Sequence, residues 1–415
     1  MPAAGLPSGG VSRTLYVLPT GHLASLLENP PPSTFLFMSS AGATLPPAIK
    51  MRPSDVVASF LLLLASIAAA HGALQAGFYK GKCDSHDVEA LIQSVVRSQF
   101  RRDPTLAPAL MRMQFHDCFV RVRNIVINAE TPASRPPFIP PGSACFGNLV
   151  LFSLLTIYGC MSGLPQGCDA SILLDGNSSE KTAGPNQSVR GYGFIDQVKT
   201  VLESLCPGVV SCADIIVAAT RDVIAMVGGP KYAVQMGRRD GRISRSGDVN
   251  LPGPSISVAQ ASVVFRGKGL MTSDMVVLLG GHTIGVTHCS FVTGRIYNFQ
   301  GSGSADPTMD PALVSQLQSR CPQNAAVDAT VNLDQNPRSA NVVDNSFYQQ
   351  IARKRGILQI DQSLALHRTT RQTVALLANG TGFPAQFGAA MVKLGNIQVL
   401  TGRQGEIRES CRSVN

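Results

Sequence analysis

The chain has 415 residues, of which 44% are hydrophobic and 15% charged, and this balance excludes an intrinsically disordered protein. The formal net charge is +9, but lysine and arginine are scattered and form no basic patch interleaved with aromatic residues, which argues against nucleic-acid binding. The length exceeds that of an ordinary single domain, so we expect two lobes or one domain with extensions.

Two N-terminal segments precede the expected domain. Residues 1–50 are rich in proline, serine and glycine, and we interpret them as an extension that is not native to the protein. Residues 51–73 are typical of a signal peptide, because a basic start is followed by apolar residues from Val56 to Ala70 and then by small residues. This stretch is too short to span a bilayer comfortably, so no membrane span is expected in the mature form. If translation starts at Met1, the stretch is internal and secretion no longer follows.

The cysteines indicate the compartment. Ten of them lie between Cys83 and Cys411, and none belongs to a CxxC metal-binding pattern. An even number of well-separated cysteines indicates disulfides and an oxidising environment. Sequons for N-glycosylation at Asn177, Asn186 and Asn379 agree with export, so we expect a secreted protein.

From about Leu74 to the C-terminus, the apolar residues recur mainly at helical spacing. Helices are predicted over 88–100, 105–119, 194–205, 213–227, 258–265 and 274–279, and near 345–354, 370–378 and 385–394. Strand-like alternation is scarce, and glycine and proline clusters such as 251–254 mark loops. The pattern predicts an all-α domain of many short helices over 74–415.

Residues 122–166 do not fit this pattern. They begin rich in proline and turn into an apolar run over 149–158, which has no clear polar face and is too short for a membrane span. Cys145 and Cys160 lie within them. We interpret this segment as an insertion into the domain, of the kind that a retained intron produces.

Arg112 and His116 lie four residues apart in the predicted helix 105–119, so their side chains share one face. A guanidinium beside a neutral imidazole is a poor structural pair, because each disfavours charge on the other. The pair suits a site in which a base removes a proton and a cation stabilises the anion left behind. Spacing alone favours the alternative, a surface arginine and a half-buried histidine without a common role.

A second histidine, His282, follows Gly280 and Gly281, which let the backbone pass close to a flat or bulky group. His282 could bind iron, and a histidine near a helix end without a ligand is the ordinary alternative. Zinc at His288 and Cys289 is disfavoured, because no other ligand pair stands at a useful spacing. Asp361 is a candidate for the carboxylate behind a metal-bound histidine, and a solvated loop aspartate is its alternative.

Six motifs in order along the chain resemble those of the secreted class III plant peroxidases. They are Phe115 to Val120, Gly167 to Leu174, Val210 to Asp214, Gly237 to Asp240, Gly280 to Gly285 and Leu394 to Ile397. The resemblance covers about Gln75 to Asn415 apart from the insertion. It implies a two-lobed, all-α haem peroxidase fold with haem b between a distal and a proximal lobe.

The resemblance implies roles for the residues of the haem pocket. His282 corresponds to the axial iron ligand and Asp361 to the carboxylate that makes this ligand more basic. His116 corresponds to the distal base that moves a proton of hydrogen peroxide. Arg112 corresponds to the cation beside it, and Asn186 to the residue that orients His116, so the sequon at Asn186 is expected to be unused.

Two calcium ions are also implied. The residues that correspond to a distal site are Asp117, Val120, Gly167, Asp169, Ser171 and, through water, Glu180, and those of a proximal site are Thr283, Asp334, Ser339, Val342 and Asp344. Such a mixture of carboxylate, hydroxyl and carbonyl oxygens suits a hard cation. Asp334 is displaced by two residues from the family's position, which Asn336 occupies, so we expect weaker calcium binding at the proximal site.

Eight cysteines correspond to the four disulfides of the family, Cys83–Cys206, Cys118–Cys168, Cys212–Cys411 and Cys289–Cys321. The remaining Cys145 and Cys160 both lie in the insertion, which supports its treatment as foreign to the fold. Where this chain has residues 121–166 between Val120 and Gly167, family members usually have one residue. The insertion therefore interrupts the implied distal calcium loop.

The implied function is reduction of hydrogen peroxide to water with one-electron oxidation of small phenolic donors, which dock at an opening beside Pro252. We expect a monomer that is secreted to the cell wall or apoplast, with the vacuole as an alternative. A rival interpretation is a haem-binding or misfolded chain that the insertion has inactivated. The intact Arg112, His116, His282 and Asp361 do not distinguish these possibilities.

Overall fold

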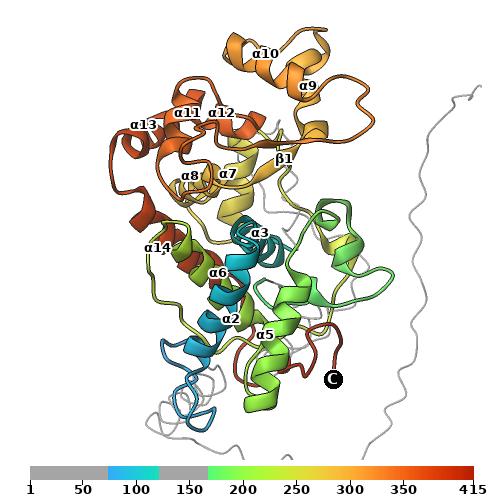
Figure 1. Cartoon of the computed structure of the whole chain (residues 1–415), viewed down its shortest axis with the longest axis vertical. Helices are drawn as coiled ribbons and strands as arrows, with labels where there is room; N and C mark the ends of the chain where they lie inside the picture. Colours follow the sequence, from blue (N-terminus) through green and yellow to red (C-terminus); the bar gives the residue numbers. More distant parts are fainter. Residues whose placement is uncertain (1–72, 121–166) are drawn as a thin grey trace, which may run out of the picture. The chain divides into compact units, whose positions relative to one another are not determined.

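The computed structural model describes residues 73–120 and 167–415, and this part of the chain is mainly helical (Figure 1). Its α-helices are α2 (Val88–Arg102), α3 (Leu106–Cys118), α5 (Tyr192–Leu205), α6 (Cys212–Met226), α7 (Val258–Gly267), α8 (Thr272–Leu279), α9 (Thr293–Tyr297), α10 (Pro311–Arg320), α11 (Ser346–Ala352), α12 (Gln359–Leu366), α13 (Arg371–Asn379) and α14 (Phe383–Gly395). The short strands β1 (Val286–His288) and β2 (Thr330–Asn332) pair antiparallel, with Thr287 opposite Val331. The all-α prediction is confirmed.

Three helices, α9, α10 and α12, were not predicted from the apolar spacing. Helix α10 carries ordinary start signals, because Pro311 opens it and the side chain of Asp310 accepts a hydrogen bond from the backbone N–H of Leu313. Helix α12 carries the candidate residue Asp361 in its first turn. The alternative of a solvated loop aspartate is therefore wrong.

Helix α6 is the centre of a first group of helices. Nearly all of its residues are buried, as is typical of a helix that is apolar on every face. Helices α2, α3 and α5 pack against it, and Figure 1 shows α2, α3 and α6 side by side. This group includes the helix that carries Arg112 and His116.

A second group surrounds the segment that contains His282. Helices α11, α12 and α13 pack against one another, and α11 also contacts the 3-10 turn Gly280–Thr283. Helix α14 joins the two groups, because it contacts both α3 and α8. This division agrees with the expected two-lobed fold.

The four disulfides that the resemblance implies are present, as Cys83–Cys206, Cys118–Cys168, Cys212–Cys411 and Cys289–Cys321. The predicted N-terminal extension and the 122–166 insertion, with Cys145 and Cys160, lie outside the described residues, as does the signal peptide except for its last residue. Among the helices over 73–120 and 167–415, none has both the length and the apolar character needed to cross a membrane.

A buried ion pair connects α6 to the end of α14. Nη1 of Arg238 donates to Oδ1 of Asp214 at 2.8 Å, and both side chains are almost fully inaccessible. The hydroxyl of Tyr79 donates to the other Asp214 oxygen at 2.7 Å, and Nε of Arg238 donates to the carbonyl of Gly395 at 2.8 Å. The pair therefore fixes α6 against the end of α14.

Replacing Asp214 with alanine is expected to lower the free energy of unfolding by about 3–5 kcal/mol, because it leaves Arg238 buried without its counter-charge. Urea unfolding followed by circular dichroism measures the change. Asp328→Ala is the matched control, since Asp328 pairs with His288 at the surface and its loss is expected to leave stability unchanged within error. Equal losses in both variants contradict the argument.

Candidate active site

Helix α3 brings Arg112 and His116 into contact, as their spacing predicts. Nε of Arg112 donates a hydrogen bond to Nε2 of His116, with 3.2 Å between the nitrogens. Leu110 and Met113 of the same helix are fully buried in the core. His116 is 6% exposed, so it is buried and not the half-buried histidine of the alternative interpretation.

The loop that contains Asn186 fixes the ring of His116. Nδ1 of His116 lies 2.6 Å from Oδ1 of Asn186, whose amide nitrogen donates to the carbonyl of Glu180 at 2.8 Å. The amide oxygen must therefore face the ring, which assigns the proton to Nδ1 and leaves Nε2 as an acceptor.

The electrostatic surroundings keep His116 neutral. Burial, and then the charge of Arg112, lower the pKa of His116 to about 4, although the bond to Asn186 acts in the opposite direction. At neutral pH the imidazole is uncharged, so Nε2 can accept a proton.

The same loop holds the guanidinium of Arg112. Nη1 donates to the hydroxyl of Ser188 at 3.1 Å, and Nη2 donates to the carbonyl of Pro185 at 2.9 Å. Asn186, between them, is 1% exposed and bonded at both ends of its amide, so its side chain is closed to a glycan. Asn177 and Asn379, in the other two sequons, are exposed.

Two glycines allow the His282 segment to lie in a crowded place. A Cβ on Gly280 would stand 2.2 Å from the hydroxyl of Tyr348, and one on Gly281 would stand 3.2 Å from the terminal methyl of Met111. Because Met111 precedes Arg112 on α3, the glycines let the His282 turn approach the helix of the first histidine. The sequence predicts a close approach of the backbone to a bulky group here, and the groups it approaches are the side chains of Tyr348 and Met111.

His282 is anchored through one ring nitrogen. Its Nδ1 lies 2.9 Å from Oδ1 of Asp361, which is 0% exposed. Burial lowers the pKa of His282, but the charge and the hydrogen bond of Asp361 outweigh it, so the pKa is raised overall. Arg112 also acts on this pKa and lowers it, which puts the guanidinium within electrostatic reach of both histidines.

A model of the peroxidase family matches residues 92–380, a range that includes both histidines and their partners. The chain belongs to the peroxidase family. Peroxidase 60 of Arabidopsis thaliana is 42% identical to this peroxidase over 369 residues, which are 88% of this chain and 97% of the relative. Peroxidase 57 of Arabidopsis thaliana is 44% identical over 358 residues, with 86% and 97% covered. This chain is thus a haem peroxidase that resembles plant relatives over nearly their whole length.

The residues of this peroxidase fit a haem. Nδ1 of His282 is held by a carboxylate, Nε2 has no hydrogen-bond partner among the described residues, and 30% of the side chain is exposed. An imidazole with one nitrogen anchored and the other available suits an axial iron ligand. Asp361 stands where a carboxylate would accept the hydrogen bond from Nδ1 of such a ligand.

The residues of the implied distal calcium site converge from α3 and the segment after the insertion. Asp117 accepts hydrogen bonds from the backbone N–H groups of Ala170 and Ile172, which brings α3 against this segment. Four buried oxygens have no hydrogen-bond partner, namely Oδ2 of Asp169, Oγ of Ser171 and both carboxylate oxygens of Glu180. Oxygen acceptors without donors suit a hard cation.

Side chains alone do not complete this site. Among residues 73–120 and 167–415, no three histidine, cysteine or acidic side chains come together closely enough to hold a metal. The implied set also draws on the carbonyls of Val120 and Gly167 and on the hydroxyl of Ser171. Backbone and hydroxyl oxygens are ordinary calcium ligands, so this finding is compatible with the implied site.

The carboxylates of this set repel one another when no cation is present. Burial and the charges of Asp117 and Asp169 raise the pKa of Glu180 to about 9, and burial is the main reason that the pKa of Asp169 rises to about 6. Burial and the charge of Asp169 raise the pKa of Asp117 as well. Each acid therefore takes up a proton more readily in the folded chain than in the unfolded one.

Calcium removal is expected to destabilise this peroxidase more at about pH 8 than at about pH 5. The raised pKa values contribute stability that is complete below the ordinary carboxyl pKa and is lost as pH rises through about 6 for Asp169 and about 9 for Glu180. Calcium favours the ionised acids and so reverses this loss. Melting temperatures of metal-stripped and calcium-loaded protein at both pH values measure the effect, with magnesium as the control cation. If the difference in melting temperature between calcium-loaded and metal-stripped protein does not grow with pH, the expectation is contradicted.

Part of the implied proximal calcium set is already assembled. The hydroxyl of Thr283, next to His282, donates to the carbonyls of Val342 at 3.0 Å and of Asp344 at 3.2 Å. The turn that carries His282 is thereby tied to the segment before α11.

Asp334 and Asn336 both lie near this proximal set. Asp334 is 1% exposed, its Oδ2 has no partner, and its pKa is raised by burial and by the charge of Asp344. The amide nitrogen of Asn336 donates to the hydroxyl of Ser339 at 2.9 Å. The displaced aspartate is therefore directed inward, and the asparagine in the family's register contacts the same set.

Pro252 lines a surface pocket of about 350 Å³. Its apolar lining includes Leu251, Ile256 and Val264, and its polar lining includes Asn250 and Gln260. A small aromatic molecule matches such a lining in polarity.

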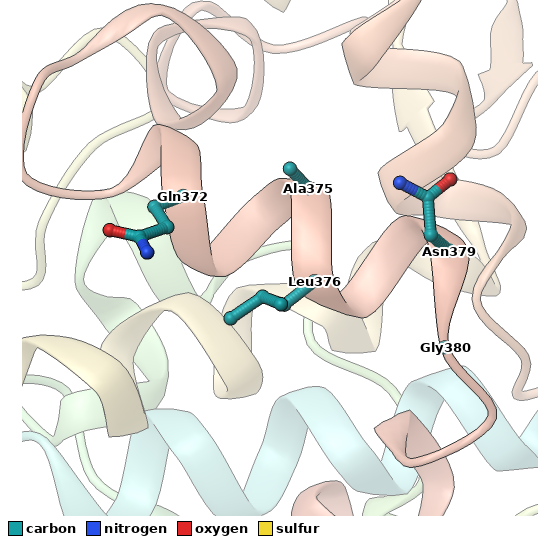
Figure 2. Close-up of a pocket in the computed structure, with 5 residues that line it drawn as sticks. All are labelled: Gln372, Ala375, Leu376, Asn379 and Gly380. Carbon is teal, nitrogen blue, oxygen red and sulfur yellow. The ribbon is translucent and has the colours of Figure 1, made fainter.

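A second pocket lies along α13 and includes the sequon residue Asn379. Figure 2 shows its lining, which is Gln372, Ala375, Leu376, Asn379 and Gly380. Leu376 is 68% exposed. None of the predicted site residues lines this pocket.

Sequence reasoning missed Lys268 and Gln398. Nζ of Lys268 donates to the carbonyl of Val120 and to Oε1 of Gln398. The only signal was a lysine at the end of a helix, which is most often solvated. Lys268 is instead 6% exposed.

Proposed function

We propose that this peroxidase holds haem b through His282, reduces hydrogen peroxide to water, and takes the two electrons one at a time from small phenols. When bound, haem supplies the redox chemistry that breaks the O–O bond and oxidises the donor. The observation that carries the proposal is the pair of anchored imidazoles, His116 on Asn186 and His282 on Asp361, with Arg112 acting on both.

The proton steps are assigned to His116. Its Nε2 is unprotonated at neutral pH, so it can exchange the hydrogen bond from Arg112 for one from hydrogen peroxide. It then takes that proton and returns it to the oxygen that leaves as water. Arg112 supplies the positive charge that stabilises the developing anion, because its guanidinium is fixed by Ser188 and Pro185. Asn186 keeps the ring in the required orientation and tautomer.

The proposed donors are phenols that dock beside Pro252. The apolar pocket of Leu251, Pro252, Ile256 and Val264 is the support for this choice. Two molecules of phenol each lose one electron and one proton, and one peroxide becomes two molecules of water, so atoms and electrons balance.

The proposed setting is a secreted monomer with two bound calcium ions, in the cell wall or apoplast or else in the vacuole. The four disulfides support an oxidising compartment. We also propose that 122–166 is an insertion, 51–73 a signal peptide and 1–50 an extension foreign to the protein. The Cys118–Cys168 disulfide supports the first of these, because it joins the two sides of the gap.

The test is peroxide-dependent oxidation of guaiacol by residues 74–415 with haem and calcium, beside the same chain without 122–166. Phenol oxidation by both proteins is expected, because loop-closure entropy rises only slowly with length. Activity in the shortened chain alone would mean that the insertion inactivates this enzyme. If both proteins bind haem and neither oxidises the phenol, the proposal is wrong.

A further inference from the structure

Lys268 is a buried cation outside the haem pocket. It caps the C-terminus of α7, and its Nζ donates to the carbonyl of Val120 and to Oε1 of Gln398, the latter at 2.9 Å. An ammonium is buried at acceptable cost only when acceptors and opposite charge surround it. The opposite charge comes from the distal acids, since Asp117, Asp169 and Glu180 all act on Lys268 electrostatically.

Lys268 contacts the distal loop at Val120, where the loop begins. The loop ends at Gly167, and this end is held by Ile397 and Gln398. The backbone N–H of Cys168 donates to the carbonyl of Ile397 at 3.0 Å, and a Cβ on Gly167 would stand 2.1 Å from that carbonyl oxygen. Gln398, the next residue, has a φ of 47°, a left-handed conformation that side chains disfavour. The segment Ile397–Gln398 therefore meets Gly167 directly and Val120 through Lys268.

We propose that Lys268 is a positioning residue for the distal calcium ion. It holds the carbonyl of Val120 in place to bind the ion, while Ile397 and Gln398 hold Gly167. The two backbone ligands thus keep their geometry although residues 121–166 separate them in the sequence. This inference rests on the distal calcium site of the proposed function.

Charge balance indicates that the ammonium complements calcium and does not replace it. Asp117, Asp169 and Glu180 carry three negative charges when ionised, and one calcium ion together with Lys268 carries three positive charges. Arg408 also acts on Asp117 and Asp169, but its own backbone and charge are engaged with Asp240. The charges of these three acids, the calcium ion and Lys268 therefore sum to zero.

The experiment is calcium titration calorimetry on the metal-stripped full chain and its variants, with the gain in melting temperature on calcium addition as a second readout. Lys268→Met is expected to bind calcium about tenfold more weakly, because a hydrogen bond from a charged donor to a ligand carbonyl is lost. Lys268→Arg keeps the charge and the donors and is expected to recover most of the affinity. Lys393→Met, which removes an exposed lysine paired with the buried Asp274, is the matched control and is expected to bind as the unaltered chain does.

Gln398→Leu keeps the test decisive if Lys268→Met does not fold. It leaves Lys268 and Val120 in place and is expected to weaken calcium binding about threefold, because the ammonium loses one of its anchors. Unchanged or tighter calcium binding in Lys268→Met, or in Gln398→Leu where the former does not fold, overturns the positioning role and leaves the calcium site standing. An unaltered chain that binds no calcium at this site overturns both.

Discussion

A His116→Leu variant is expected to react with hydrogen peroxide about 10²–10⁴-fold more slowly than the unaltered enzyme, because it lacks the base that moves the proton. Haem binding should persist, since His116 is not the proposed iron ligand. Stopped-flow absorbance at several peroxide concentrations gives the rate constant. The unaltered enzyme should also slow as pH falls through about 4, where His116 becomes protonated, and the variant should lose this dependence.

His288→Leu is the control for this experiment, because His288 is a partly exposed histidine on β1 whose ring pairs with Asp328. Its rate and pH profile should match those of the unaltered enzyme. A His116→Leu rate within threefold of normal, with haem bound, means that another group moves the proton.

A second large effect is expected at the other histidine. His282→Ala should abolish stable haem binding, because Nε2 of this ring is the proposed iron ligand. Asp361→Asn should retain haem but lower activity about 10–100-fold, since the carboxylate that makes the ligand basic is replaced by a neutral amide. The Soret band after gel filtration reports haem retention, and the Fe(III)/Fe(II) potential should rise in Asp361→Asn.

The matched control for the carboxylate is Asp328→Asn, which alters a surface histidine–aspartate pair and not the proximal one. It should leave the haem spectrum, the potential and the rate unchanged. Haem binding by His282→Ala that is as tight as normal contradicts the ligand assignment. An unchanged potential in Asp361→Asn contradicts the role of the carboxylate.

The sequence by itself determined the features that depend on local geometry. Apolar spacing predicted the helices α2, α3 and α6, because a helix of known pitch must direct every third or fourth residue to the same side. For the same reason, the spacing of Arg112 and His116 predicted a contact that is present at 3.2 Å. Ordered motifs determined the family, because many short matches in the same order do not arise by chance.

Local spacing could not predict partners that come from distant segments, and the tertiary structure shows how they meet. Asn186 lies 70 residues from His116, and Asp361 lies 79 residues from His282, so no local periodicity connects them. Helix α12, which carries Asp361, was not predicted, because a helix of eight residues has too few apolar positions to show helical spacing. The resemblance alone paired these residues, and packing of helices explains the pairs.

Lys268 is the clearest case of what the sequence could not determine. Two of its acceptors lie 148 and 130 residues away, on Val120 and Gln398. Whether a lysine is buried or solvated depends on the carbonyls and charges that the folded chain places beside it. The residues next to it in the sequence do not indicate those partners. Local backbone geometry is encoded residue by residue, whereas the charge and the oxygen atoms around a side chain are set by segments that meet only when the helices pack.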